Sequence, residues 1–187
     1  MAELRYPDPP LTDGTVLLRP WHPADARQRF EAFSDELCQR FSSPRLEPTT
    51  EPEVAAAFAR NEQERLAGTA LNLAIVPADD PERIWGAASV YDVDPVHARA
   101  AVGYWLAPWA RGRGAATRTV RLLASWTFGT LAVQRLELTC APDNAASIRV
   151  AERCGFTREG VLRSHLRFKE TRRDTVMFSL LPSDSAR

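Results

Sequence analysis

The sequence has no long hydrophobic run, which sets limits on where the protein works. Within its 187 residues no stretch approaches the roughly 18 consecutive apolar residues of a membrane span. The N-terminus carries Glu3, Arg5 and Asp8 where an export signal needs an apolar core. We therefore expect neither a membrane anchor nor a signal peptide, and a cytoplasmic location.

Cysteine is also scarce. Cys38, Cys140 and Cys154 are an odd number of cysteines and have no Cys-x-x-Cys spacing, which argues against a disulfide framework and against a zinc cluster. Reduced, buried thiols and no metal site are expected.

No sign of charge predominates, because 24 basic side chains balance 24 acidic ones. A neutral chain has no general attraction for phosphate backbones, so neither nucleic acid nor membrane is expected as a partner. With 44% apolar and 26% charged residues, the composition is typical of one globular domain. We expect this domain to span residues 1–187, with an ordered core over about residues 12–182.

Hydrophobic periodicity predicts an α/β chain. Expected helices cover Ala24–Phe41 and the segment from a capping box at Thr50 and Glu53 to Gly68. Strands are expected at Thr15–Trp21, Leu71–Val76, Ile84–Tyr91 and Ala98–Leu106. The expected elements of the last third are helix Ala115–Phe128, strand Gln134–Cys140, helix Asn144–Cys154 and extended segments Phe156–Phe168 and Asp174–Leu181. This order predicts α/β units that continue an antiparallel meander.

Positive charge gathers in one stretch of this neutral chain. No acidic residue lies between Asp94 and Glu137, and the six arginines in that interval are Arg99, Arg111, Arg113, Arg118, Arg121 and Arg135. Four of them surround a turn with two glycines that leads from a strand into a helix. A helix N-terminus has unpaired N–H groups and a partial positive charge, so it favours phosphate oxygens. The alternative is a solvated helix face that pairs with acids elsewhere.

Three kinds of phosphate site use such a turn. A P-loop needs a lysine that this turn lacks. A Rossmann fingerprint needs a third glycine or alanine where Thr117 stands, and its βα unit usually opens a domain, whereas about a hundred residues precede this one. The third kind is the diphosphate turn of an acyl-coenzyme A transferase.

Arg111-Gly112-Arg113-Gly114-Ala115-Ala116 matches the Arg/Gln-x-x-Gly-x-Gly/Ala signature of the GNAT family of N-acetyltransferases, and the chain resembles the RimJ/RimL-like branch of that family. The likeness spans nearly the whole chain. The motifs that carry it are Leu18-Arg19-Pro20-Trp21, Gly103-Tyr104-Trp105-Leu106-Ala107-Pro108, Asn144-Ala145-Ala146-Ser147, Glu152-Arg153-Cys154-Gly155-Phe156, Glu159-Gly160-Val161-Leu162-Arg163, Arg173-Asp174 and Phe178-Ser179-Leu180-Leu181.

The resemblance implies an α/β (α+β) fold: a mixed, mostly antiparallel sheet with flanking helices, splayed between its fourth and fifth strands. Here these strands would be Ala98–Leu106 and Gln134–Cys140. It also implies acetyl-CoA, or another short acyl-CoA, as cosubstrate, with no metal. The residues expected to bind it are Tyr104, Trp105, Leu106, Arg111, Gly112, Arg113, Gly114, Ala115, Ala116, Thr117, Asn144 and Ser147.

In such enzymes the amine attacks the thioester directly, and the departing thiolate needs a proton. Many relatives use a tyrosine where this chain has Ala151, and Ser147 is the replacement in the RimL-like branch. Ser147 and Asn144 are therefore expected to be catalytic, although both could simply begin a helix.

A general base is harder to identify, because Ala100 and Ala101 stand where relatives often carry a glutamate. The candidates are Glu137, Glu159, His165 and Tyr104, each with an ordinary structural alternative, and Glu137 is the one that we place among the expected catalytic residues. An α-amine with a pKa of about 8 is neutral often enough to need little help, unlike a lysine with a pKa of about 10.4.

We expect an acetyl-CoA-dependent N-acetyltransferase that acts on a primary amine, with the N-terminal α-amine of a protein as the favoured acceptor. The alternatives are a small-molecule amine acetyltransferase, acting on an antibiotic or a polyamine, and a non-catalytic acyl-CoA-binding sensor. The sequence leaves open whether the chain forms a homodimer. The arginine-rich stretch Arg149–Arg173 could attract an acidic peptide or ribosomal RNA, and solvated charge is the simpler interpretation.

Overall fold

The computed structural model describes residues 3–42 and 50–184, and an eight-stranded sheet forms its centre. The strands are β1 (Leu11–Thr12), β2 (Val16–Arg19), β3 (Leu71–Pro77), β4 (Gly86–Asp94), β5 (Arg99–Leu106), β6 (Arg135–Cys140), β7 (Thr157–Phe168) and β8 (Thr171–Leu180). Their order in the sheet is β1-β2-β3-β4-β5-β6-β8-β7. Only β5 and β6 are parallel neighbours among the described strands. The predicted mixed, mostly antiparallel sheet is thus confirmed.

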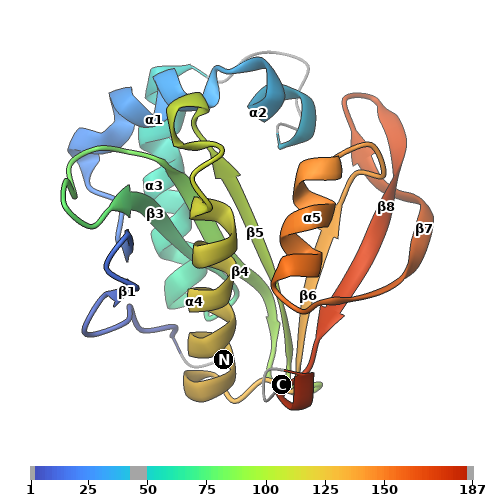
Figure 1. Cartoon of the computed structure of the whole chain (residues 1–187). Coiled ribbons are helices and arrows are strands. Elements are labelled where there is room, and N and C mark those ends of the chain that lie inside the picture. The colour runs from blue at the N-terminus through green and yellow to red at the C-terminus, as the bar shows by residue number, and fades with distance from the viewer. Residues whose placement is uncertain (1–2, 43–49, 185–187) are drawn as a thin grey trace.

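Helices flank this sheet on both faces. They are α1 (Ala26–Phe33), α2 (Glu36–Phe41), α3 (Glu51–Leu66), α4 (Ala115–Thr130) and α5 (Ala145–Arg153). In Figure 1, α4 and α5 lie in front of the sheet, α3 lies behind it, and α2 lies across its upper end. Over residues 3–42 and 50–184, no helix combines the length and the apolar character needed to cross a membrane.

Helix α4 packs on the sheet by the face that its periodicity predicts. Val120 and Leu123 are fully buried, while Arg118 and Arg121, on the opposite face, are exposed. This packing holds the start of α4, where the predicted phosphate turn lies, at a defined place above the sheet.

The prediction of one helix over Ala24–Phe41 is wrong, because the chain breaks between α1 and α2. Asp35 is extended, with φ −60° and ψ 142°, and its carboxylate accepts the N–H groups of Leu37 and Cys38 at 3.0 and 3.2 Å. An aspartate that caps the next turn in this way competes with continuation of the helix before it.

The N-terminal segment, which precedes the expected core of about residues 12–182, packs against the fold. Leu4 is buried, and its backbone N–H and C=O bond to the Arg65 carbonyl and guanidinium at 2.9 and 2.6 Å. The Tyr6 hydroxyl bonds to Glu62 at 3.1 Å. Residues 1–2 and 185–187 lie outside the described residues.

Cys38, Cys140 and Cys154 are free thiols. Burial raises the pKa of each to about 11. None of the three therefore carries an appreciable thiolate population at neutral pH.

A buried ion pair ties β2 to the turn that follows it. The two guanidinium nitrogens of Arg19 lie 2.8 and 3.0 Å from the carboxylate oxygens of Asp25, and the side chains are 7% and 3% exposed. Asp25 also accepts the backbone N–H of His22 at 2.7 Å.

We predict that Asp25→Ala lowers the free energy of unfolding by about 3–5 kcal/mol, because it leaves the Arg19 charge buried without a partner. Urea denaturation measures the loss. Asp79→Ala, which removes an exposed carboxylate, is the matched control and should change stability by less than about 0.5 kcal/mol. Equal losses of stability in the two variants would show that the Arg19–Asp25 ion pair does not stabilise the fold as we expect.

Candidate active site

The sheet opens between β5 and β6. The two strands are paired over Arg99–Ala101 and Arg135–Glu137, and beyond these residues they diverge (Figure 1). The predicted splay is therefore confirmed. Because the short strand β1 was not predicted, the diverging strands are the fifth and sixth along the chain.

The divergence leaves the backbone of β5 facing an open space. The N–H of Ala107 donates to the Trp85 carbonyl on the β4 side at 2.8 Å. Backbone groups alternate in direction along an antiparallel strand, so those of Tyr104 and the N–H of Leu106 point the other way, into the gap. The Leu106 carbonyl is already bound by Arg111. A ligand in the gap can therefore pair with the strand.

A cavity of about 600 Å³ lies at this opening, bounded by α2, the end of β5, the turn before α4 and the start of α5. Most of the residues expected to bind the cosubstrate line it. They are Tyr104, Trp105, Leu106, Arg111, Gly112, Gly114, Ala115, Ala116, Thr117, Asn144 and Ser147. Of the expected set, Arg113 stands outside the cavity wall.

The turn before α4 has the geometry that an anion site needs. Gly112 and Gly114 have φ of +74° and +76°, the left-handed conformation that favours glycine. No side chain caps the helix start at Gly114, and Ala115 and Ala116 are small and buried. The first amides of α4 are thus available to a ligand, and the helix dipole favours a negative one.

Arg111 links the turn before α4 to the end of β5 and to the start of α2. Its guanidinium pairs with the Asp35 carboxylate and donates to the Leu106 carbonyl at 3.2 and 2.9 Å. The hydrogen bond from Arg111 lowers the pKa of Asp35. Sequence analysis missed Asp35, although an aspartate just before Glu36 and an apolar pair is a recognisable helix-capping signal.

Three of the predicted residues meet at the start of α5. The Tyr104 hydroxyl donates to Ser147 Oγ at 3.2 Å, and Asn144 Oδ1 accepts the Ser147 N–H at 3.1 Å. Burial raises the pKa of Tyr104 to about 12. Tyr104 was considered as a base, and its raised pKa keeps the hydroxyl protonated, so that it acts as a hydrogen-bond donor instead.

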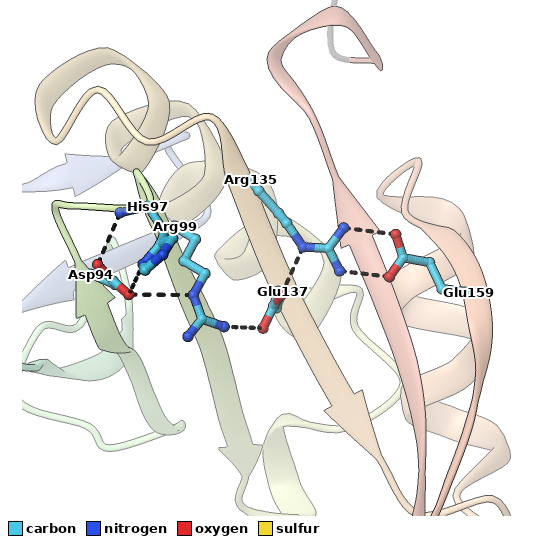
Figure 2. A network of polar contacts seen from close by, with 6 residues as sticks. All are labelled: Asp94, His97, Arg99, Arg135, Glu137 and Glu159. Atoms are coloured by element: carbon cyan, nitrogen blue, oxygen red, sulfur yellow. Dashed lines mark hydrogen bonds and ion pairs between the residues drawn. The ribbon is translucent and has the colours of Figure 1, made fainter.

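The other candidates for a base lie elsewhere. Figure 2 shows Glu137 between two arginines, 2.7 Å from Arg135 and 3.8 Å from Arg99, at the closed end of the splay. Arg135 also binds both oxygens of Glu159, at 2.7 and 2.6 Å, and holds the pKa of Glu159 at about 2. Glu159, with its lowered pKa, is a weak base.

Neither glutamate is in the wall of the 600 Å³ cavity. Glu137 borders a separate cavity of about 450 Å³ beside the β4–β5 turn. His165 lies on β7, with Nδ1 2.7 Å from the Thr175 hydroxyl. The structure therefore brings Tyr104, Asn144 and Ser147 together, and it does not bring Glu137 to them.

Solved structures of acetyltransferases share this fold. MccE, the microcin C7 self-immunity acetyltransferase in complex with acetyl-CoA and AMP, superposes with a TM-score of 0.80 at 23% identity over 93% of this chain and 99% of MccE. RimL, the ribosomal L7/L12 α-N-protein acetyltransferase in complex with coenzyme A, superposes with a TM-score of 0.79 at 22% identity over 94% of this chain and 98% of RimL.

Sequence comparison gives the same result. The N-acetyltransferase p20 of Bacillus licheniformis is 30% identical over 82% of this chain and 89% of p20. YdaF of Bacillus subtilis (strain 168), provisionally named a ribosomal N-acetyltransferase, is 35% identical over 51% of this chain and 52% of YdaF. The acetyltransferase (GNAT) domain model matches residues 15–157. The chain belongs to the GNAT family of N-acetyltransferases.

Proposed function

We propose that this protein transfers an acetyl group from acetyl-CoA to the N-terminal α-amine of a polypeptide. One observation carries the proposal: a single cavity joins the uncapped start of α4 to the hydrogen-bonded pair of Tyr104 and Ser147. The first feature suits a diphosphate, and the second suits a hydrogen bond to a negatively charged leaving group.

The residues of the cavity fit acyl-CoA. The α4 amides and the turn at Gly112 and Gly114 suit the diphosphate, and the open edge of β5 can pair with the amides of the pantetheine arm. MccE was solved in complex with acetyl-CoA and AMP, and RimL in complex with coenzyme A, which supports this choice. When bound, the cosubstrate supplies the acyl group and a thiolate leaving group.

The chain itself supplies polarisation of the thioester carbonyl and a hydrogen bond to the leaving group. Backbone N–H groups of β5 that face the gap can stabilise negative charge on a carbonyl oxygen. Because the Tyr104 hydroxyl donates to Ser147 Oγ, it occupies one lone pair of that oxygen and leaves the Ser147 hydrogen free to point into the cavity. Ser147 is thus placed to donate a hydrogen bond to the departing thiolate, and Tyr104 orients it. The proton that the amine releases on attack then neutralises the thiolate sulfur.

The scarcity of bases in the cavity favours an α-amine acceptor. Among its described lining residues the one carboxylate is Asp143, which pairs with Arg40 at 2.7 Å. An α-amine has a pKa of about 7.7–8.0, so a large fraction is neutral near pH 7.5, whereas a lysine near 10.4 is almost wholly charged. RimL is named an α-N-protein acetyltransferase, which supports the same kind of acceptor.

The cavity favours this acceptor over the alternatives. Polyamines and aminoglycosides are cationic, and an acidic cleft would attract them, whereas exposed Arg40, Arg149 and Arg153 line this cavity. A sensor that only bound acyl-CoA would have no use for the hydrogen-bond donor that Tyr104 and Ser147 form.

We predict that Ser147→Ala lowers kcat roughly 10- to 100-fold, because the charged thiolate loses the hydrogen bond that Ser147 donates to it. Tyr104→Phe should lower kcat about tenfold through the orientation of Ser147. The double variant should be no slower than Ser147→Ala, since Tyr104 acts through Ser147. Thiol-release kinetics measure the rates, and calorimetry should show CoA affinity unchanged within about twofold. If the two losses in kcat multiply in the double variant, Tyr104 does not act through Ser147.

Arg113→Glu should weaken CoA binding about tenfold, because it places a negative charge beside the diphosphate turn. Arg113 is exposed, and its Nε bonds only to the Trp109 carbonyl among the described residues, so the fold should tolerate the change. Calorimetric titration with CoA measures the affinity. Arg83→Glu, at an exposed site before β4, makes the same change in charge and should bind CoA as the wild type does. Equal CoA affinity in both variants would show that the turn before α4 does not bind the diphosphate.

The acceptor can be tested with one peptide in two forms, one with a free N-terminus and one with a blocked N-terminus and an internal lysine. The free form should be acetylated at its α-amine, with kcat/KM rising with pH and levelling above about pH 8 as the amine becomes neutral. The raised pKa of Tyr104, about 12, keeps this donor protonated to beyond pH 10. Mass spectrometry locates the acetyl group. Acetylation of the blocked form, with a rate still rising at pH 10, would indicate a lysine acceptor instead.

A further inference from the structure

We propose that the β7–β8 hairpin docks an acidic segment of the polypeptide acceptor, downstream of its N-terminus. The inference rests on the proposed function and names the class of its substrate. The relevant surface, called here the hairpin arm, comprises residues 157–174.

The hairpin arm carries positive charge that the rest of the fold does not neutralise. Its basic residues are Arg158, Arg163, Arg167, Lys169, Arg172 and Arg173. None of them lies within 4.0 Å of a carboxylate in residues 3–42 and 50–184. Of the three acids on the arm, Glu159 is already held by Arg135 and Asp174 accepts the Ser164 N–H at 2.6 Å. The arm is thus a basic surface on a chain of zero net charge.

Apolar side chains are exposed among these cations. Val161, Leu162 and Leu166 are 43%, 37% and 39% exposed, and β7 is the edge strand of the sheet. Aliphatic side chains beside unpaired cations suit a polypeptide with both acidic and apolar residues, because such a partner can cover both kinds of group.

The arm borders the mouth of the active-site cavity. Arg173 Nη2 approaches the carbonyl of Phe41 at 3.4 Å, and Phe41 lines the cavity. In Figure 1 the β7–β8 turn rises beside α5 to the level of α2. A chain whose first residue enters the cavity can therefore reach the arm with the residues that follow.

A protein partner fits these features better than RNA does. Single-stranded nucleic acid binds through aromatic platforms for its bases and a strongly basic field. The arm has two aromatic rings, those of Phe168 and His165. The Phe168 ring centroid lies 3.6 Å from the Arg173 guanidinium carbon and is thereby occupied, and His165 Nδ1 lies 2.7 Å from the Thr175 hydroxyl. The remaining apolar groups are aliphatic and cannot stack with bases.

Steady-state kinetics with two peptides tests the proposal. Both have about 12 residues, long enough to extend roughly 40 Å, and share their first three residues; one continues with Asp and Glu, the other with Asn and Gln. For the wild type at low salt, kcat/KM should be about tenfold higher for the acidic peptide, and the advantage should shrink at 0.5 M salt. The double variant Arg163→Glu/Arg167→Glu should lose it. The double variant Arg5→Glu/Arg83→Glu, with the same change in net charge at exposed sites outside the arm, should keep it.

A tripeptide with the shared first three residues separates this proposal from the proposed function. It lacks the acidic residues that the arm is proposed to bind, so the wild type and both double variants should acetylate it equally. If the tripeptide is acetylated and the acidic peptide has no advantage, the docking proposal alone is overturned. If no peptide is acetylated, the proposed function fails and the docking proposal fails with it. If poly(U) inhibits acetylation of the acidic peptide and the arm substitutions abolish poly(U) binding without changing peptide preference, the arm binds nucleic acid and the proposal is wrong.

Discussion

Hydrogen bonding between β5 and β6 ends at Ala101 and Glu137, and the active site depends on that interruption. A sheet that continued to pair would consume the backbone groups of Tyr104 and Leu106 and leave no space for a ligand. Because the strands diverge, the end of β5 and the starts of α4 and α5 surround one cavity. Arg111 spans part of the opening, since it joins the Leu106 carbonyl to Asp35 at the start of α2.

Local signals in the sequence predicted the parts of this arrangement that depend on neighbouring residues. The stripe through Val120 and Leu123 predicted which face of α4 is buried, and the two glycines before it predicted a turn open to the ligand. Asn144 was recognised as a residue that could begin a helix, and it does cap α5. The order of strands and helices, with the family resemblance, then led to the splayed sheet.

Contacts between distant residues could not be predicted in this way. The partner of Arg111 is Asp35, 76 positions earlier in the chain, and the Tyr104–Ser147 pair joins a strand to a helix 43 positions later. Glu137 was attractive as a base until the structure placed it between Arg99 and Arg135. In each case the chemistry of the side chain depends on a partner that folding brings to it.

Hydrogen–deuterium exchange of the intact protein with and without CoA tests the central claim most directly. If CoA occupies the gap between β5 and β6, amides at residues 102–106 and 114–118 should exchange more slowly when it is added, while those around Asp94 and Arg99, beside the second cavity, should not change. Slower exchange confined to that second cavity, or no change at either place under saturating CoA, would contradict the account.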